Sequence, residues 1–490
     1  MDGPFILAID QSTSGTKALL FDAQGDILCR ADRPHAQKIS ANGWIAHDPV
    51  EIYRNTLAAV ADLLRKSGVD GGEIIGAGIS NQRETAMVWD RAAGQPVYDA
   101  VVWQCPRGAE ICGRLAADAE TIRARTGMPL SPYFSAAKIA WILEHTGNTD
   151  NPGLCAGTID SWLVYKLTGN FKTDWSNASR TQLLNLAALR WDEELCGLFG
   201  ISPAMLPRIC DSDSLFGLSD FEGILPRPAP LRAVTGDSHG ALFAQGCLER
   251  GMAKATYGTG SSVMVNVGAK PVFCKSLATS LAWGRGGAID YVLEGNINYA
   301  GAVIKWLVED LGLLSSSKEA GPLAQAANPA DTSYLVPAFS GLGAPHWVSG
   351  ARACLCGMSR STGRAEIVRA AEESIAYQIA DVVRAIQEEG GVSLAELRAD
   401  GGAAGDSFLM QFQSDILKLP LSVPGPEELS AMGAAYMAGI ALGLYSPAVL
   451  SRCRRTRYSP RMDGETRDRR YQGWRNALRM VKDGGVLWET

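Results

Sequence analysis

A strand–turn–strand pattern with a polar tip occurs twice in the 490-residue chain, about half a chain apart. The first copy spans residues 5–21 and the second spans residues 252–268. Each copy has apolar runs on both sides of a tip rich in Gly, Ser and Thr, which is typical of an antiparallel β-hairpin. Repetition of one unit at this distance predicts two related domains, which we place at residues 1–247 and 248–490.

The tips of both hairpins have the chemistry of a phosphate site. Hydroxyl and backbone N–H groups gathered at a turn can surround a phosphate, and Gly258 and Gly260 in the second tip permit close approach of the backbone. Asp10 ends the first strand of the first hairpin, where a carboxylate can hold Mg²⁺ directly or through water. The alternative is an ordinary Ser/Thr hairpin, and these residues alone do not decide between the two.

The composition limits the partners of the chain. Its 46 basic and 52 acidic residues give a net charge of −6, which argues against nucleic acid or an anionic membrane as the main partner. The eleven cysteines include no Cys-x-x-Cys pair and the five histidines no His-x-x-x-His pair, so free thiols in a reducing cytosol are favoured over zinc or disulfides. No run approaches about 18 consecutive apolar residues. We therefore expect a cytoplasmic protein with neither a signal peptide nor a membrane span.

Gly236-Asp237 lies near the middle of the chain, between an apolar strand pattern at 231–234 and an apolar run at 241–245. This position puts a carboxylate at the N-terminus of a helix, beside unpaired N–H groups and the positive end of the helix dipole. Asp237 is therefore expected at the N-cap of the helix. It is also a candidate catalytic base, and the choice depends on what surrounds it.

A polar pocket is indicated where two predicted strands end. The strand at 74–79 runs into the polar stretch 80–85, and a second strand at 100–105 ends in polar and aromatic residues. Arg83 and Glu84 offer donors and acceptors suited to a vicinal diol, and Tyr133 precedes a helix that could close the pocket. A purely structural ion pair between Arg83 and Glu84 is the alternative.

Helical periodicity and capping residues mark several further elements. Gly401 to Gly405 form a turn that can pass under a flat adenine ring, although neither the G-x-G-x-x-G nor the G-x-x-x-x-G-K-[ST] spacing occurs. After the last expected helix we expect a charged tail. The helices are expected at residues 48–67, 136–145, 191–200, 301–311, 364–387, 407–416 and 431–442.

Several motifs occur in an order that resembles a known family. They include Asp10-Gln11-Ser12-Thr13, Asn81-Gln82-Arg83-Glu84-Thr85, Val102-Trp103-Gln104-Cys105, Asn177-Ala178-Ser179-Arg180-Thr181, Gly236-Asp237, Tyr257-Gly258-Thr259-Gly260 and Asp400-Gly401-Gly402. With these motifs the chain resembles, over essentially its whole length, the FGGY carbohydrate kinases of the actin-like ATPase superfamily, and among them the glycerol kinases. The resemblance implies an α/β fold of two ribonuclease H-like domains with ATP in the cleft between them.

The resemblance also implies a reaction and its residues. ATP would phosphorylate a small polyol, with glycerol as the first choice and glycerol 3-phosphate as the product, and a homo-oligomer, a dimer or a tetramer, is compatible with it. Asp10 would serve Mg²⁺, and Asp237 would accept the proton of the attacking hydroxyl. Residues implied around the polyol are Arg83, Glu84, Trp103, Tyr133, Asp237, Ser238 and His239. Residues implied along the nucleotide are Thr13, Ser14, Lys17, Thr259, Gly301, Lys305, Gly402 and Asp406.

The chain departs from the glycerol kinase pattern at the acceptor side. Ser238 and His239 stand where the family usually has two glutamines, and Ser262 stands where it usually has an aromatic residue. Asp406 replaces an expected asparagine, and the Gly-rich loop that some members use for sugar-bisphosphate inhibition has no counterpart before Gly236. A tetritol, a pentitol, xylulose or ribulose therefore stays open as the acceptor. An actin-like chaperone or filament ATPase, or a sensor without turnover, are alternatives from other classes.

Overall fold

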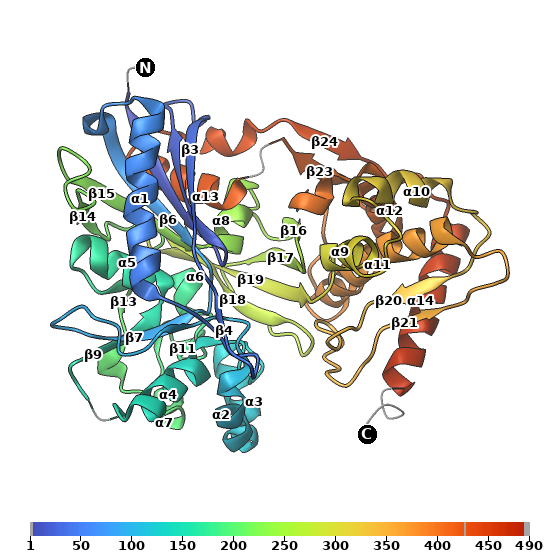
Figure 1. Cartoon of the computed structure of the whole chain (residues 1–490), viewed down its shortest axis with the longest axis horizontal. Helices are drawn as coiled ribbons and strands as arrows, with labels where there is room; N and C mark the ends of the chain where they lie inside the picture. The colour runs from blue at the N-terminus through green and yellow to red at the C-terminus, as the bar shows by residue number, and fades with distance from the viewer. Residues whose placement is uncertain (1–2, 150, 426–427, 485–490) are drawn as a thin grey trace.

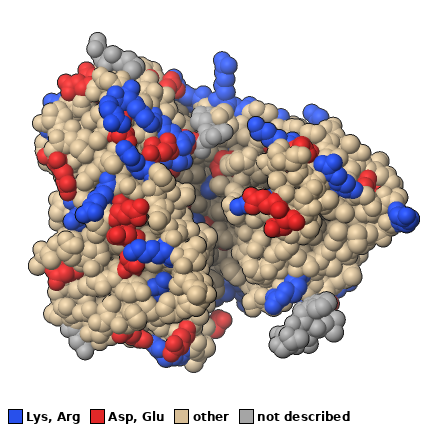
Figure 2. All heavy atoms as spheres, viewed as in Figure 1, with Lys and Arg blue, Asp and Glu red and all other residues tan. Residues whose placement is uncertain are grey.

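The computed structural model describes residues 3–149, 151–425 and 428–484. The chain forms two lobes, each built on a mixed β-sheet that helices cover, with strands β18 and β19 reaching from one lobe toward the other (Figure 1). Figure 2 shows a cleft between the lobes, with basic and acidic side chains interspersed on this face. None of the helices in the described ranges is long and apolar enough to cross a membrane.

The sheet of the N-terminal lobe is buried on both faces. On strand β1, Phe5, Leu7 and Ile9 pack with helices α1 and α5, whereas Ile6 and Ala8 pack with α8 and α13. Burial on both sides explains why β1 is a continuous apolar run in the sequence. In spatial order the strands are β14 (Gly217–Ser219), β15 (Ala229–Gly236), β6 (Ile74–Asn81), β1 (Phe5–Gln11), β2 (Gly15–Phe21) and β3 (Ile27–Pro34).

The sheet of the C-terminal lobe repeats the same pairing. In both lobes the first hairpin is antiparallel, and its first strand pairs in parallel with a second strand. That second strand pairs in parallel with a third, and the third pairs with an antiparallel strand at the edge of the sheet. The predicted repeat and the two-domain α/β fold class are therefore confirmed. In spatial order the strands are β18 (Ala278–Arg285), β19 (Ala288–Ile297), β17 (Ser261–Gly268), β16 (Ala253–Tyr257), β22 (Leu397–Asp400), β23 (Leu421–Pro424) and β24 (Arg455–Tyr458).

Smaller elements complete the two lobes. A five-stranded sheet consists of β4 (Lys38–Ile39), β5 (Ile45–His47), β8 (Ala100–Val101), β7 (Ala86–Asp90) and β9 (Leu154–Thr158). The helices of the N-terminal lobe are α1 (Pro49–Ser67), α2 (Ala109–Arg114), α3 (Ala119–Thr126), α4 (Ser135–Thr146), α5 (Ile159–Thr168), α6 (Trp175–Ala178), α7 (Glu193–Leu198) and α8 (Asp237–Ala244). Those that follow are α9 (Gly301–Glu309), α10 (Ala320–Ala326), α11 (Arg364–Glu388), α12 (Ser407–Leu417), α13 (Leu429–Ala441) and α14 (Gly464–Gly484).

Two expectations about the helices are wrong. Residues 464–484, within the expected charged tail, form helix α14, whose buried Trp474 stacks on Tyr377 of α11 at 5.3 Å between ring centroids. In the sequence its many arginines are interspersed with the apolar residues that form one face of the helix. The segment therefore has the composition of a charged tail. The helix expected at 191–200 is shorter, because Asp192 caps it and Trp191 belongs to a short strand.

Helix α13 lies in sequence between β23 and β24 of the C-terminal sheet, but it packs on the N-terminal sheet, against β6, β1 and α8 (Figure 1). It crosses α8 where Gly433 meets Gly240. A Cβ atom on Gly433 would overlap the backbone carbonyl of Gly240, and one on Gly240 would lie 2.9 Å from the carbonyl oxygen of Ser430. The close crossing therefore requires glycine on both helices, and it holds α8, which begins at Asp237.

We expect Gly433→Ala to lower the free energy of unfolding by about 1–3 kcal/mol, because the added methyl must push the two helices apart. Urea unfolding followed by tryptophan fluorescence measures the change. Gly197→Ala is the matched control, since Gly197 lies in α7 with open space around it. That variant should gain about 0.5–1 kcal/mol from helix propensity. Equal unfolding midpoints for Gly433→Ala and the unmodified protein would contradict the close crossing.

Candidate active site

A cavity of about 870 Å³ in the C-terminal lobe lies where the nucleotide was expected. It is bounded by the tip between β16 and β17, the start of α9 and the turn that leads into α12. Its volume lies in the range of small-molecule and cofactor sites. All five nucleotide residues predicted in this half line it, namely Thr259, Gly301, Lys305, Gly402 and Asp406.

The backbone around this cavity is held by close contacts. Gly301 donates its N–H to the carbonyl oxygen of Gly258 at 2.9 Å, which ties α9 to the hairpin tip. Gly401 has φ of +91°, and a Cβ atom there would lie 2.6 Å from the carbonyl oxygen of Tyr257. Asp406 caps α12 by accepting from the N–H groups of Phe408 and Leu409, at 2.8 and 3.1 Å. The turn therefore brings backbone and the start of a helix to the cavity wall.

Arg83 is the centre of the predicted acceptor site, and its partner comes from the other lobe. Its two Nη atoms each donate to an oxygen of Glu294 on β19, both at 2.9 Å. Its Nε atom lies 3.2 Å from Oδ1 of Asp237. The alternative of an Arg83–Glu84 ion pair is therefore not what the structure shows, since Arg83 pairs with residues of β19 and α8.

Glu84 pairs instead with Arg180, a fully buried residue in the turn after α6. The Nε atom of Arg180 donates to Glu84 at 2.5 Å, and its Nη1 atom lies 2.7 Å from Glu294. Burial raises the pKa of a carboxyl, but here the Arg180 and Arg83 guanidiniums hold the pKa of Glu294 well below its usual range. Glu294 is therefore a buried carboxylate shared by two guanidiniums.

Sequence reasoning assigned no role to Arg180 or Glu294. Arg180 stood in one of the motifs that carried the family resemblance, so a signal existed for it. Glu294 directly follows the apolar residues Val292 and Leu293 in β19, and a carboxylate in such a place is rarely buried without a partner. The contrast between this carboxylate and its apolar neighbours was the signal by which Glu294 could have been predicted.

Asp237 is the first residue of α8, and Gly236 is the N-cap, so the expected cap position is wrong by one residue. A Cβ atom at Gly236 would lie 2.7 Å from Cγ of Arg83. Glycine at the cap thus lets the Arg83 side chain pass over the start of the helix. The Asp237 side chain accepts from the N–H of Ser238 at 2.6 Å and is 36% exposed, so it faces open space.

Asp10 and Lys17 form the phosphate side of the site with a third residue that was not predicted. The Lys17 ammonium lies 3.9 Å from Asp10 and 2.8 Å from Glu428, which precedes α13. Glu428 also pairs with Arg30. Burial, opposed by Lys17 and reinforced by Asp237 and Glu428, raises the pKa of Asp10 to about 6. Two carboxylates therefore hold Lys17.

The phosphate tip and the acceptor pocket are in direct contact. The indole N–H of Trp103 donates to the hydroxyl of Thr13 at 3.0 Å. The rings of Trp103 and Tyr133 pack edge to face, with 5.4 Å between centroids. Ser14 lies in the same tip, with its hydroxyl 3.4 Å from that of Ser12. The structure thus brings the residues predicted for the two substrates to one place.

The three acceptor-side departures differ in exposure. Ser238 and Ser262 are partly exposed, and Ser262 donates to Glu294 at 2.9 Å. His239 is fully buried, and neither ring nitrogen has a partner among the described residues. Burial, followed by repulsion from Arg83, holds the pKa of His239 well below its usual range, so the ring is neutral. His239 therefore lies behind the site as an uncharged group.

Comparison with known proteins identifies the family. Residues 5–239 match the N-terminal domain, and residues 253–442 the C-terminal domain, of the FGGY family of carbohydrate kinases. The chain belongs to this family. It is therefore a phosphotransferase of a kinase family, and the predicted class of enzyme is confirmed.

Relatives of this FGGY kinase extend over nearly its whole length. It is 46% identical to Glycerol kinase 1 of Thermotoga maritima, over 97% of this chain and 99% of the relative. It is 42% identical to the glycerol kinase of Xanthomonas campestris, over 98% of both chains. The structure of Plasmodium falciparum glycerol kinase with ADP has a TM-score of 0.91 at 34% identity, over 97% of this chain and 98% of that one. The gluconate kinase of Lactobacillus acidophilus, with a TM-score of 0.89 at 20% identity over 98% of both chains, shares the fold.

Proposed function

We propose that this FGGY kinase transfers the γ-phosphate of ATP to a terminal hydroxyl of a small polyol, with glycerol as acceptor and glycerol 3-phosphate as product. Relatives at 41–46% identity over nearly the full length carry the name glycerol kinase, which supports this acceptor. The observation that carries the proposal is the position of Asp237. Its carboxylate lies 3.2 Å from Nε of Arg83 and is close enough to Asp10 to help raise the pKa of that carboxyl, so it stands near residues predicted for both substrates.

The chemistry assigns distinct tasks to these residues. Asp237 accepts the proton of the attacking hydroxyl. The oxygen of that hydroxyl bonds to the γ-phosphorus while the bond between this phosphorus and the ADP oxygen breaks. Because the transition state of phosphoryl transfer is loose, the proton leaves late and a carboxylate is a sufficient base. Arg83 and Glu84 hold the neighbouring hydroxyls, while Trp103 and Tyr133 pack on the carbon chain and exclude water.

The nucleotide would be held from both lobes. Thr13, Ser14 and Lys17 would contact phosphate oxygens from the N-terminal lobe, with Lys17 exchanging Glu428 for phosphate. The remaining contacts would come from the walls of the 870 Å³ cavity. Those residues are Thr259, Gly301, Lys305, Gly402 and Asp406.

Asp10 is the candidate ligand for Mg²⁺, either directly or through water. Among the residues that the structure describes, no group of three His, Cys, Asp or Glu side chains could hold a metal ion. A single buried carboxylate fits Mg²⁺ all the same, because this ion keeps most of its waters and shares the rest of its shell with phosphates. Bound Mg²⁺ would neutralise charge on the transferring phosphate.

A longer polyol or a ketose is the second candidate acceptor. Ser238 and Ser262 are small and partly exposed, so the pocket has no bulky wall at these two positions. Measuring the rate of ADP release with each acceptor of a panel separates the candidates. The panel contains glycerol, erythritol, threitol, ribitol, xylulose and ribulose. We expect the highest kcat/KM for glycerol, and Ser262→Phe should retain glycerol while losing longer acceptors. Turnover of a pentulose without turnover of glycerol would overturn the proposed acceptor.

Asp237→Asn should lower kcat by about 10²–10⁴-fold, because an amide cannot take the proton of the acceptor hydroxyl. ADP affinity should stay within about twofold of that of the unmodified enzyme, since Asp237 is not part of the cavity that would hold the nucleobase. Steady-state kinetics and calorimetric titration with ADP measure the two effects. Turnover near that of the unmodified enzyme would remove Asp237 from the role of base.

The demand for Mg²⁺ should depend on pH through Asp10. Its pKa of about 6 means that the carboxyl is neutral below that pH and charged above it. Since Mg²⁺ binds the charged form, the free Mg²⁺ needed for half-maximal rate should rise about tenfold for each pH unit below 6, after correction for the fraction of MgATP. Asp10→Asn should need high Mg²⁺ at every pH. A flat Mg²⁺ demand below pH 6 in the unmodified enzyme would contradict the assignment.

A further inference from the structure

Glu372 on α11 is a buried carboxyl group in the wall of the nucleotide cavity, and the proposed mechanism gives it no task. The residue is 2% exposed. Its Oε2 atom is buried and has no hydrogen-bond partner among the described residues. A buried polar atom without a partner costs free energy unless something completes its hydrogen bonding. The position of this carboxyl makes the ligand of the cavity the natural partner.

The surroundings of Glu372 favour the protonated form. Burial, reinforced by the facing Asp406 carboxylate, raises the pKa of Glu372 to about 8. The other charged groups that line the cavity are Lys305 and Glu309, which pair with each other on α9 at 3.5 Å, and Lys318. At neutral pH Glu372 therefore offers one O–H donor beside one carbonyl acceptor.

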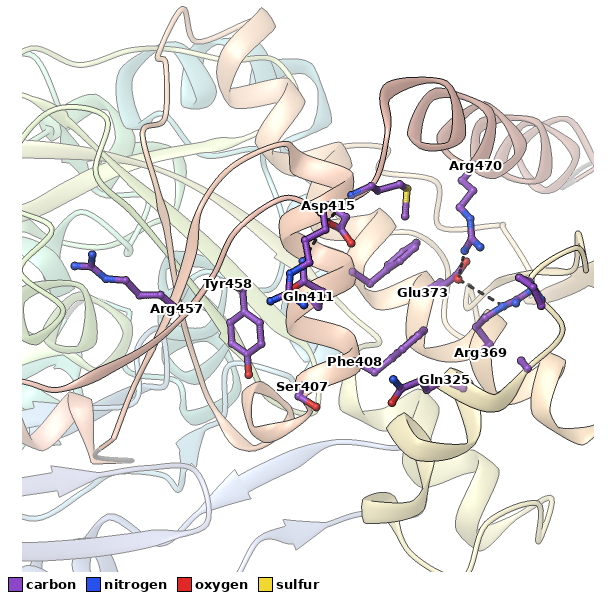
Figure 3. A pocket seen from close by; sticks show the side chains of 16 residues that line it. Gln325, Arg369, Glu373, Ser407, Phe408, Gln411, Asp415, Arg457, Tyr458 and Arg470 are labelled. Carbon is purple, nitrogen blue, oxygen red and sulfur yellow. Dashed lines mark hydrogen bonds and ion pairs between the residues drawn. The ribbon is translucent and has the colours of Figure 1, made fainter.

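Glu373, the next residue on α11, shows what a paired carboxyl looks like in the same helix. It lines a second cavity of about 480 Å³, where Figure 3 shows it beside Arg470 and Arg369. There it accepts from Arg470 at 2.6 Å and from Tyr377 at 3.2 Å, with Arg369 at 3.5 Å. The buried acid of this second cavity is thus satisfied by the protein itself, whereas Glu372 is not.

We propose that Glu372 contacts the nucleobase, and that its protonated carboxyl binds adenine in preference to guanine. The inference rests on the proposed function only in taking the 870 Å³ cavity as the nucleotide site. Adenine presents an amino donor at N6 beside a ring-nitrogen acceptor, which matches the acceptor and donor of a neutral carboxyl. An ionised carboxyl has only acceptors and matches two adjacent donors. Guanine has such a pair at N1 and N2, and adenine has none.

The protonation state of Glu372 therefore sets the base preference. Below about pH 8 the neutral carboxyl completes its hydrogen bonding with adenine. Above that pH the negative charge faces the lone pair of the adenine ring nitrogen and favours guanine. The preference for an adenine nucleotide should therefore weaken as pH rises, and the change should depend on Glu372 alone.

Equilibrium binding of ADP and GDP in the absence of acceptor tests the inference. For the unmodified protein, the ratio of ADP to GDP affinity should fall about tenfold between about pH 7 and about pH 9. Glu372→Leu should weaken ADP about tenfold at pH 7 and remove the pH dependence. Glu372→Gln keeps a donor and an acceptor without titrating, so it should retain ADP binding and lose only the pH dependence. The KM for the polyol should not change in either variant.

Glu373→Gln is the matched control. It changes the neighbouring carboxyl of α11, so it should lower thermal stability while leaving the ratio of ADP to GDP affinity and its pH dependence unchanged. Unaltered ADP affinity in Glu372→Leu, or an affinity ratio that shifts with pH equally in Glu372→Gln, would overturn the inference. Nucleotide binding is measured without turnover. Absence of kinase activity with every acceptor would therefore contradict the proposed function but not the proposed recognition of the nucleobase by Glu372.

Discussion

One buried carboxylate, Glu294, joins the two lobes at the acceptor site. It lies between the guanidiniums of Arg83 and Arg180, and each of them also contacts a further carboxylate, Asp237 or Glu84. Removing one partner from such a buried set costs about 3–5 kcal/mol, since it leaves an uncompensated charge in a low-dielectric interior. The orientation of Arg83, and with it the distance from Arg83 to Asp237, therefore depends on a strand of the other lobe.

On the predicted phosphate side, a partly exposed cation, Lys17, is likewise shared by two carboxylates. Lys17 is held by Asp10 and by Glu428, which stands just before the helix that returns from the C-terminal lobe. An incoming triphosphate would replace carboxylates around Lys17 with phosphate oxygens. The charge of Lys17 is thus balanced by carboxylates of the protein itself, which limits the reorganisation needed when substrate binds.

Local sequence patterns predicted the parts of this structure that local physics decides. The hairpins around Thr13 and Thr259 and the long helix α11 followed from periodicity and turn residues, and the family match confirms the enzyme class. Candidate site residues such as Asp10 and Asp237 were predicted because a recognisable motif contains them. Glu294, Glu428 and α14 were not, because their burial is created by segments that are far away in the sequence. No periodicity of β19 alone shows that a guanidinium from residue 83 will meet it.

The crossing of α8 and α13 at Gly240 and Gly433 bears on how the chain matures. Strands β1, β6 and β15 have been synthesised once Gly236 is reached, yet the apolar face that α13 covers stays open until residues 429–441 have also been made. During translation the N-terminal lobe therefore exposes one face of its central sheet, the kind of surface that chaperones bind and that drives aggregation. The helix that carries Asp237 reaches its final packing only after α13 has been synthesised.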